Sequence, residues 1–263
     1  MAIYVLPTGV NHRTAAFAYR GGSPTERWES VLNAVLVRHP KGDLLIDAGL
    51  GKTIDSQLKR MPFTFRLATA LAPGRTAAEQ LEAAGYDLSR LRFILLTHAH
   101  WDHVSGAPDL AGIPVLVTAP ERRFISEGGW LTVSARDIEP SRLREYAFEG
   151  GRYLGFEHSH DFYGDGSVVA VPAPGHTPGS VIVFVNLREK RYAFVGDLVW
   201  QRQALVERAE RPWFVKRQLD LDPVALQGSL LRMNAVAMRF PEIQIVPSHD
   251  PRGYDGIPER PAR

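Results

Sequence analysis

Short apolar runs alternate with turn-forming residues along most of this chain, and the alternation predicts a fold in which strands and helices are mixed. Residues 93–96 are a clear example, because Phe-Ile-Leu-Leu without a polar interruption indicates a buried strand. Runs of this kind predict strands at about residues 3–6, 30–38, 43–47, 93–97, 114–118, 168–172, 180–186, 192–195 and 244–247.

Helices are expected in three of the intervening stretches. Residues 76–84 are rich in Ala, Glu and Leu, with Thr76 placed to act as the N-cap. Residues 120–127 begin with Pro in the first turn, and residues 222–240 carry apolar positions at helical spacing. Helices that alternate with strands predict an α/β fold class, with layers of helix outside two sheets.

Composition is that of an ordinary globular enzyme. The chain has 263 residues, of which 44% are hydrophobic and 23% charged, so a single domain spanning residues 1–263 can bury a sizeable core. The absence of Cys excludes disulfides but does not fix the compartment. Residues 1–7 lack a basic start, which predicts a first strand instead of a signal peptide and hence a cytoplasmic protein. No apolar window is long enough to predict membrane insertion.

The charge pattern gives only a weak signal for nucleic acid. The net charge is +2, and no aromatic residues are interleaved with the basic ones in a binding motif. A solvated basic surface and a small-molecule substrate are therefore expected. The loosely grouped basic residues are Arg202, Arg208, Arg211, Lys216, Arg217, Arg252, Arg260 and Arg263.

Metal-binding side chains follow several predicted strands. Three imidazoles and one carboxylate stand within six residues, in the sequence His-Ala-His-Trp-Asp-His that starts at His98. A polar loop of chance composition would account for this segment alone, but similar donors follow other strands farther along the chain. Such convergence of nitrogen and oxygen donors is typical of a transition-metal site. The full set of candidate donors is His98, His100, Asp102, His103, His176, Asp197 and His249.

These motifs, in this order along nearly the whole chain, resemble the metallo-β-lactamase superfamily. The resemblance implies a four-layer αβ/βα sandwich with the metals at one edge between the two sheets. It further implies that His98, His100 and His176 hold one metal ion. A second ion would be held by Asp102, His103 and His249, with Asp197 bridging both.

Two divalent cations held about 3.5 to 4 Å apart can convert a shared water into a bridging hydroxide that attacks a carbonyl. Asp102 is the candidate catalytic residue, because its second oxygen could accept and pass on the proton of that water. Zinc suits the thiolate-free donors best, although iron, manganese and cobalt suit them too. Asp47, in an Asp-x-Gly turn, could fix a ligand loop by accepting a hydrogen bond, or could simply form the turn.

The chain order and the late Ser248-His249-Asp250 most resemble the N-acyl homoserine lactonases, whose opening of a lactone ring is a quorum-quenching activity. A thioesterase of the glyoxalase II type shares the seven ligands but adds a C-terminal helical domain, whereas only a short stretch follows His249 here. Another ester, a thioester or a β-lactam stays open as the substrate. The same ligands would also suit an iron oxidoreductase, or a metal-binding scaffold that has lost turnover.

Aromatic residues are the candidate substrate contacts. Trp101 lies inside the metal motif, and Trp200 stands where lactonases have a Tyr, so its indole N–H could bind substrate or its ring could pack beneath the site. Aromatic surface can also support a homodimer. His158 and His160 are expected in an exposed polar turn. The remaining candidates for an apolar wall are Phe63, Phe65, Trp130, Phe162, Tyr163, Trp213 and Phe214.

Overall fold

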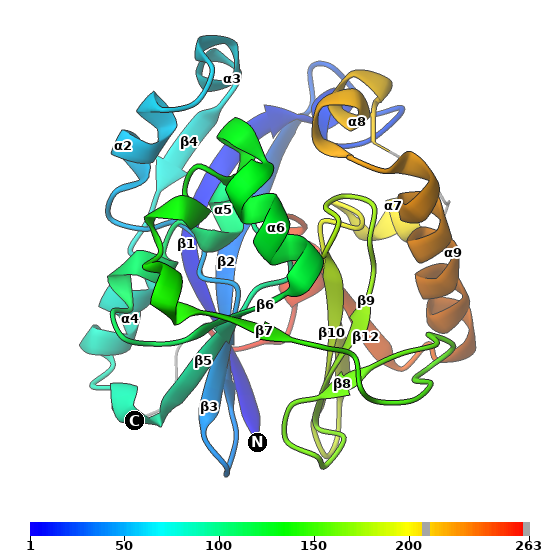
Figure 1. Ribbon diagram of the computed structural model, residues 1–263. Coiled ribbons are helices and arrows are strands. Elements are labelled where there is room, and N and C mark those ends of the chain that lie inside the picture. Colours follow the sequence, from blue (N-terminus) through cyan, green and yellow to red (C-terminus); the bar gives the residue numbers. More distant parts are fainter. Residues whose placement is uncertain (207–210, 260–263) are drawn as a thin grey trace. The chain divides into compact units, whose positions relative to one another are not determined.

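A computed structural model describes residues 1–206 and 211–259, which form two β-sheets and a set of helices (Figure 1). Among the predicted basic residues, Arg208, Arg260 and Arg263 lie outside the described part. The chain divides into two compact units. Unit 1 comprises residues 1–12, 31–146 and 255–263, and unit 2 comprises residues 13–30 and 147–254. The single domain over residues 1–263 stays a prediction.

The larger sheet is seven-stranded and belongs mainly to unit 1, with the strand order β4-β1-β2-β3-β5-β6-β7. Strands β3, β5, β6 and β7 run parallel, so their carboxyl ends share one edge of the sheet. The loop that follows β5 at this edge carries the His-rich motif. The strands are β1 (Ala2–Thr14), β2 (Arg27–Arg38), β3 (Asp43–Ile46), β4 (Ala70–Pro73), β5 (Leu91–Leu95), β6 (Val115–Thr118) and β7 (Leu143–Tyr146).

The smaller sheet belongs to unit 2 and has the order β12-β11-β10-β9-β8. Strands β11 and β12 are parallel neighbours, so the residues that follow them emerge at the same edge. Asp197 follows one of these strands and His249 the other. The strands are β8 (His160–Asp161), β9 (Val168–Pro172), β10 (Val181–Asn186), β11 (Arg191–Gly196) and β12 (Ile243–Pro247).

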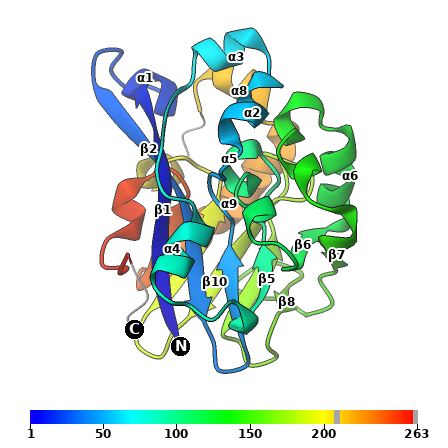
Figure 2. The ribbon, with the colours of Figure 1, turned by 90° about the vertical axis from the view of Figure 1, so that its left-hand side faces the viewer.

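Two helices of unit 1, α4 and α6, begin at a threonine whose side chain caps them. The Thr76 hydroxyl accepts a hydrogen bond from Glu79 N–H, and the Glu79 carboxylate accepts one from Thr76 N–H, so the predicted cap of α4 is a capping box. Figure 2 shows α4 against the larger sheet. The helices are α2 (Ile54–Lys59), α3 (Phe63–Leu67), α4 (Ala77–Ala83), α5 (Trp101–Val104) and α6 (Ala119–Glu127).

The longest described helix, α9 (Pro223–Arg239), lies in unit 2 and matches the prediction for residues 222–240. Asp222 caps it by accepting hydrogen bonds from Val224 and Ala225 N–H, both 3.0 Å long. Its buried face, which includes Leu226 and Met233, packs with side chains of the smaller sheet. The other helices of this unit are α1 (Ala15–Ala18), α7 (Arg202–Val206) and α8 (Trp213–Leu219).

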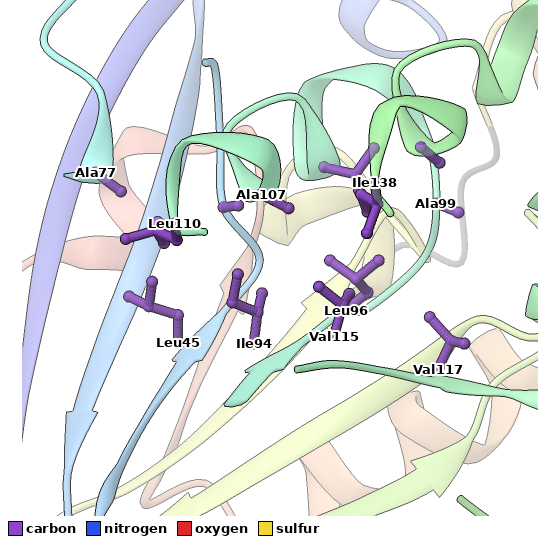
Figure 3. Close-up of a cluster of buried hydrophobic side chains, with 14 of the residues drawn as sticks. Leu45, Ala77, Ile94, Leu96, Ala99, Ala107, Leu110, Val115, Val117 and Ile138 are labelled. Carbon is purple, nitrogen blue, oxygen red and sulfur yellow. The ribbon is translucent and has the colours of Figure 1, made fainter. Parts of the chain in front are cut away.

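Each unit has an apolar core of its own. In unit 1, side chains from β3, β5 and β6 meet α4 and the loops around Leu110 and Ile138 (Figure 3). In unit 2, Phe184 and its neighbours on the smaller sheet pack against α9 and α7. These cores hold the strand ends from which the candidate metal ligands emerge.

Most predicted strands are confirmed, and the differences have local causes. Strand β1 continues to Thr14 through Pro7 and Gly9, residues that usually interrupt strands, because Gly9 pairs with Pro73 of the edge strand β4. Strands β4, β7 and β8 differ from the prediction: each has at most four residues, β7 and β8 are largely polar, and β4 ends in a proline. No described helix is long and apolar enough to cross a membrane.

Candidate metal centre

The loop between β5 and α5, together with α5 itself, brings three imidazoles of unit 1 together. The ring centroid of His98 lies 4.7 Å from that of His100 and 4.0 Å from that of His103. All three side chains are buried. Asp102 lies in the first turn of α5 and is partly buried. Buried imidazoles packed this closely form a suitable nitrogen-rich donor set for a divalent transition metal.

Asp47, the first residue after β3, holds this loop through its carboxylate. Its carboxylate accepts hydrogen bonds from Thr97 N–H (2.7 Å) and from the Thr97 hydroxyl (2.8 Å). It also lies 2.7 Å from Nδ1 of His103. When a carboxylate binds one imidazole nitrogen in this way, it fixes the ring and leaves the other nitrogen to coordinate a metal. Asp47 has a φ of 55°, a left-handed conformation that Asp tolerates better than most residues.

Glu121 is a further residue of this kind, and the sequence patterns did not reveal it. Its Oε1 accepts a 2.6 Å hydrogen bond from the backbone N–H of Ala99, between two of the imidazoles. Glu121 is buried, and its charge adds to burial in raising the pKa of Tyr146. The position of Glu121, three residues after the N-cap Thr118, indicates only a helix start, so the sequence contains no sign of the contact with Ala99.

In unit 2, the Asp197 carboxylate faces two imidazoles. Oδ1 lies 3.1 Å from Nε2 of His249, and Oδ2 lies 3.5 Å from Nε2 of His176. The side chains of all three residues are buried. A carboxylate placed between two imidazole nitrogens suits a ligand that bridges two metal ions.

The turn that carries His176 is fitted closely against the start of α9. Gly175 has a φ of +134° and no room for a Cβ, because the backbone of Leu226 lies against it. The Gly175 carbonyl accepts a hydrogen bond of 2.9 Å from Asp222 N–H. Nδ1 of His176 lies 2.8 Å from Oδ1 of Asp220. His176 is therefore held as His103 is, with its Nδ1 on a buried carboxylate and its Nε2 left for a metal.

A buried cation balances the charge of Asp220. Nη1 of Arg211 donates to Oδ1 of Asp220 at 2.7 Å. Burial alone would raise the pKa of Asp220, but Arg211 and the hydrogen bond from His176 outweigh it and hold the pKa below its usual value. Burial, reinforced by Arg211, lowers the pKa of His176 against the opposing effect of Asp220 and Asp197. A neutral imidazole is the form that binds a metal.

Two expectations for individual residues need correction. Arg211 was expected on a solvated basic surface but is buried, because it pairs with Asp220; Arg202, Arg217 and Arg252 are exposed as expected. His160 does not lie in an exposed turn. It is part of β8, where its Nδ1 lies 2.8 Å from the carbonyl oxygen of Ala147.

The two candidate substrate contacts, Trp101 and Trp200, are both buried. Trp101 belongs to an apolar cluster of unit 1, and its ring centroid lies 5.9 Å from that of Phe65. In unit 2, the indole N–H of Trp200 donates a 2.7 Å hydrogen bond to Oδ2 of Asp197. Roles for these two residues in substrate binding stay predictions.

The chain belongs to the metallo-beta-lactamase superfamily, whose family model matches residues 28–239. It is 30% identical to a probable metallo-hydrolase of Mycobacterium tuberculosis, over 84% of this chain and 75% of that protein. It is 21% identical to an N-acyl homoserine lactonase of Agrobacterium fabrum, over 86% of this chain and 84% of that one.

Among solved structures, the chain resembles an N-acyl homoserine lactone hydrolase with the product N-hexanoyl-L-homoserine bound at its catalytic metal centre. The TM-score is 0.77 at 18% identity, with 100% of this chain and 99% of that chain covered. This likeness confirms the α/β fold class with two sheets. Family and fold together define a hydrolytic enzyme that binds divalent metal, and both units contain His and Asp side chains that could hold it.

Proposed function

We propose that this enzyme is a dinuclear metal-dependent hydrolase that opens the ring of a lactone of the N-acyl homoserine class. The ligands of one metal ion would be His98, His100 and His176, and those of the other Asp102, His103 and His249, with Asp197 shared. The observation that carries the proposal is the common support of His103 and His176. Each has its Nδ1 on a buried carboxylate, the arrangement that orients an imidazole for a metal.

When bound, two divalent ions would supply Lewis-acid activation of the lactone carbonyl and of the attacking water. The protein's own part is to hold the ligands rigid and to move one proton. The oxygen of water forms a bond to the carbonyl carbon, and the ring C–O bond breaks. We assign the proton transfer to Asp102, whose carboxylate accepts the proton from water and returns it to the departing ring oxygen. The product is an N-acyl homoserine with a new hydroxyl and a carboxyl group, which becomes a carboxylate by releasing the second proton of the water to solvent.

The Trp200 contact favours a second candidate substrate class for the same site. Because the indole N–H of Trp200 donates to Asp197, it is not directed to a substrate carbonyl as the phenol of a lactonase Tyr would be. A site without a phenol directed at the substrate carbonyl would suit a thioester, another ester or a β-lactam. The proposal also includes zinc as the native metal and a small-molecule substrate, with no nucleic acid as a partner. It further includes a homodimer, a quorum-quenching activity and a cytoplasmic location.

The decisive experiment counts metals by elemental analysis and assays the same preparation. Short-chain and long-chain acyl homoserine lactones are compared with a β-lactam and a glutathione thioester. Two metals per chain with fast lactone opening that a chelator abolishes would support the proposal. Two metals with turnover of the thioester or β-lactam alone would move the substrate to the second class, and less than one metal per chain would overturn the dinuclear site.

The role of Asp102 has its own test. The Asp102→Asn variant keeps one oxygen as a ligand but removes the proton acceptor. We expect kcat to fall at least about 100-fold, the usual contribution of general acid–base catalysis, with two metals retained. Full turnover in a variant that keeps both metals would remove the assigned role.

A further inference from the structure

Arg211 is a buried arginine that contacts three groups around two of the proposed ligands. Its Nη1 donates to Asp220, its Nη2 donates to the backbone carbonyl of Asp197, and its guanidinium carbon lies 4.8 Å from the ring centroid of Trp200. Only 6% of the residue is exposed. A cation buried this deeply is unfavourable unless it is paired and hydrogen-bonded, so these contacts determine whether the arrangement is stable.

The first contact reaches His176 through Asp220. The same carboxylate oxygen, Oδ1 of Asp220, is 2.7 Å from Nη1 of Arg211 and 2.8 Å from Nδ1 of His176. An ionised carboxylate can accept both hydrogen bonds at once. The positive charge of Arg211 therefore favours the state of Asp220 that fixes the His176 ring.

The other two contacts reach Asp197. Its backbone carbonyl accepts a hydrogen bond from Nη2 of Arg211, while its side-chain Oδ2 accepts one from the indole N–H of Trp200 at 2.7 Å. The Trp200 ring in turn lies against the guanidinium, a favourable cation–π arrangement. Arg211 thus holds the backbone of Asp197 directly. It also contacts Trp200, which holds the carboxylate of Asp197.

We propose that Arg211 is a positioning residue that sets the orientation of His176 and Asp197 toward the metal ions and thereby strengthens metal binding. This inference rests on the proposed dinuclear function. Arg211 is unlike an exposed arginine, because its planar fork bonds two acceptors while its guanidinium carbon lies over an aromatic ring. A lysine could supply the charge but not this geometry.

The test compares metal binding by the full-length wild type with that of three variants. Arg211→Met removes the charge and the fork, whereas Arg211→Lys keeps the charge. Arg191→Met is the matched control in the same unit. Arg191 donates to Asn186 at 3.0 Å, pairs with Glu242 and lies 5.9 Å from the ring of Phe240, but none of these partners is a proposed ligand.

Zinc affinity is measured by chelator competition, and ligand geometry by the electronic spectrum of the cobalt-loaded proteins. We expect zinc affinity to fall 10- to 100-fold in Arg211→Met, the usual effect of losing a partner that supports a ligand. The cobalt spectrum should change as well. Arg211→Lys should lie between this variant and the wild type, and Arg191→Met should match the wild type.

Unchanged affinity and an unchanged cobalt spectrum in folded Arg211→Met would overturn the inference. If Arg211→Met does not fold, Arg211→Lys decides: wild-type affinity and spectrum overturn the inference, and weakened binding with an altered spectrum supports it. A wild type that binds no zinc would overturn the proposed function itself. If instead the wild type and the Arg211 variants all bound two metals with equal affinity, only the role of Arg211 would be overturned.

Discussion

The two units support their proposed metal-binding side chains in different ways. In unit 1, the proposed ligands His98, His100 and His103 are close in sequence, and hydrogen bonds to the carboxylates of Asp47 and Glu121 hold the loop. In unit 2, the donors His176, Asp197 and His249 come from separate segments. There, the carboxylate that supports His176 is itself paired with a buried cation, Arg211.

This difference indicates that proposed ligands from one segment and proposed ligands from several segments need different support. A short segment such as residues 98–103 already limits how far its proposed ligands can move apart, and hydrogen bonds to two carboxylates, Asp47 and Glu121, hold it. Ligands that arrive from three segments have no such limit. Unit 2 adds charge pairing and close packing, at Arg211 and Gly175, to obtain the same precision.

The largest expected effect follows from removing the carboxylate that faces two imidazoles in unit 2. Asp197→Ala should lower kcat/KM at least about 1000-fold, roughly 4 kcal/mol of transition-state stabilisation, because both metal ions would lose a ligand. Elemental analysis of the same preparation should show fewer than two metals per chain. Asp165→Ala, at an exposed turn of the same unit, is the control and should leave both measurements unchanged. Wild-type turnover in Asp197→Ala would exclude a shared ligand at this position.

The next effect separates the two modes of support by their cost in stability. Asp220→Ala would leave the Arg211 cation buried without its carboxylate, and the chelator-treated protein should lose about 3–5 kcal/mol of unfolding free energy. Asp47→Ala would leave buried donors of Thr97 and His103 without their acceptor, at about 1–3 kcal/mol for each, but it would leave no buried cation unpaired. Urea unfolding of both metal-free variants measures the difference.

The pairing of the cation can be tested further with Arg211→Met/Asp220→Asn. This double variant removes both charges together, and it should recover part of the stability lost in Asp220→Ala, since a buried pair is costly mainly when only one partner is removed. Equal losses in Asp220→Ala and the double variant would show that charge pairing is not what distinguishes unit 2.

The same contrast explains how much the sequence could predict. Donors at strand ends are visible because a lone His in a Gly/Pro-rich turn, such as His176, has no packing role. The strands before these candidate donors were predicted nearly to their ends, because runs of apolar residues mark them. Asp47 also stands out, since it begins an Asp-x-Gly turn at the end of a predicted strand.

Arg211 and Asp220 could not be recognised in this way. Their importance comes from a pairing of two charges in the interior of unit 2, and hydrophobic patterns carry no information about which charges meet there. In a basic stretch with Lys216 and Arg217, Arg211 resembles a surface residue, and burial appears only in the fold. Glu121 was missed for a similar reason, because its partner is a backbone N–H in a distant loop.

Glu121 should give a smaller effect than either Asp47 or Asp220, because it supports the ligand loop through one hydrogen bond. Glu121→Ala leaves the buried N–H of Ala99 unsatisfied, and we expect a loss of about 1–3 kcal/mol in unfolding free energy. Glu121→Gln retains an acceptor oxygen and should lose less. If Gln and Ala lower the stability equally, the negative charge matters at this position and not the hydrogen bond.

The smallest effect is expected at Thr76, which belongs to unit 1 but contacts none of the proposed ligands. Thr76→Ala removes one half of the capping box of α4, and loss of an N-cap costs about 1 kcal/mol. Zinc affinity should not change, whereas Asp47→Ala in the same unit should weaken it 10- to 100-fold. Thr76→Ser keeps the hydroxyl and should retain wild-type stability. If Thr76→Ala weakened zinc binding as much as Asp47→Ala does, general destabilisation of unit 1 would account for both results. The hypothesis that Asp47 specifically supports the loop of proposed ligands would then be wrong.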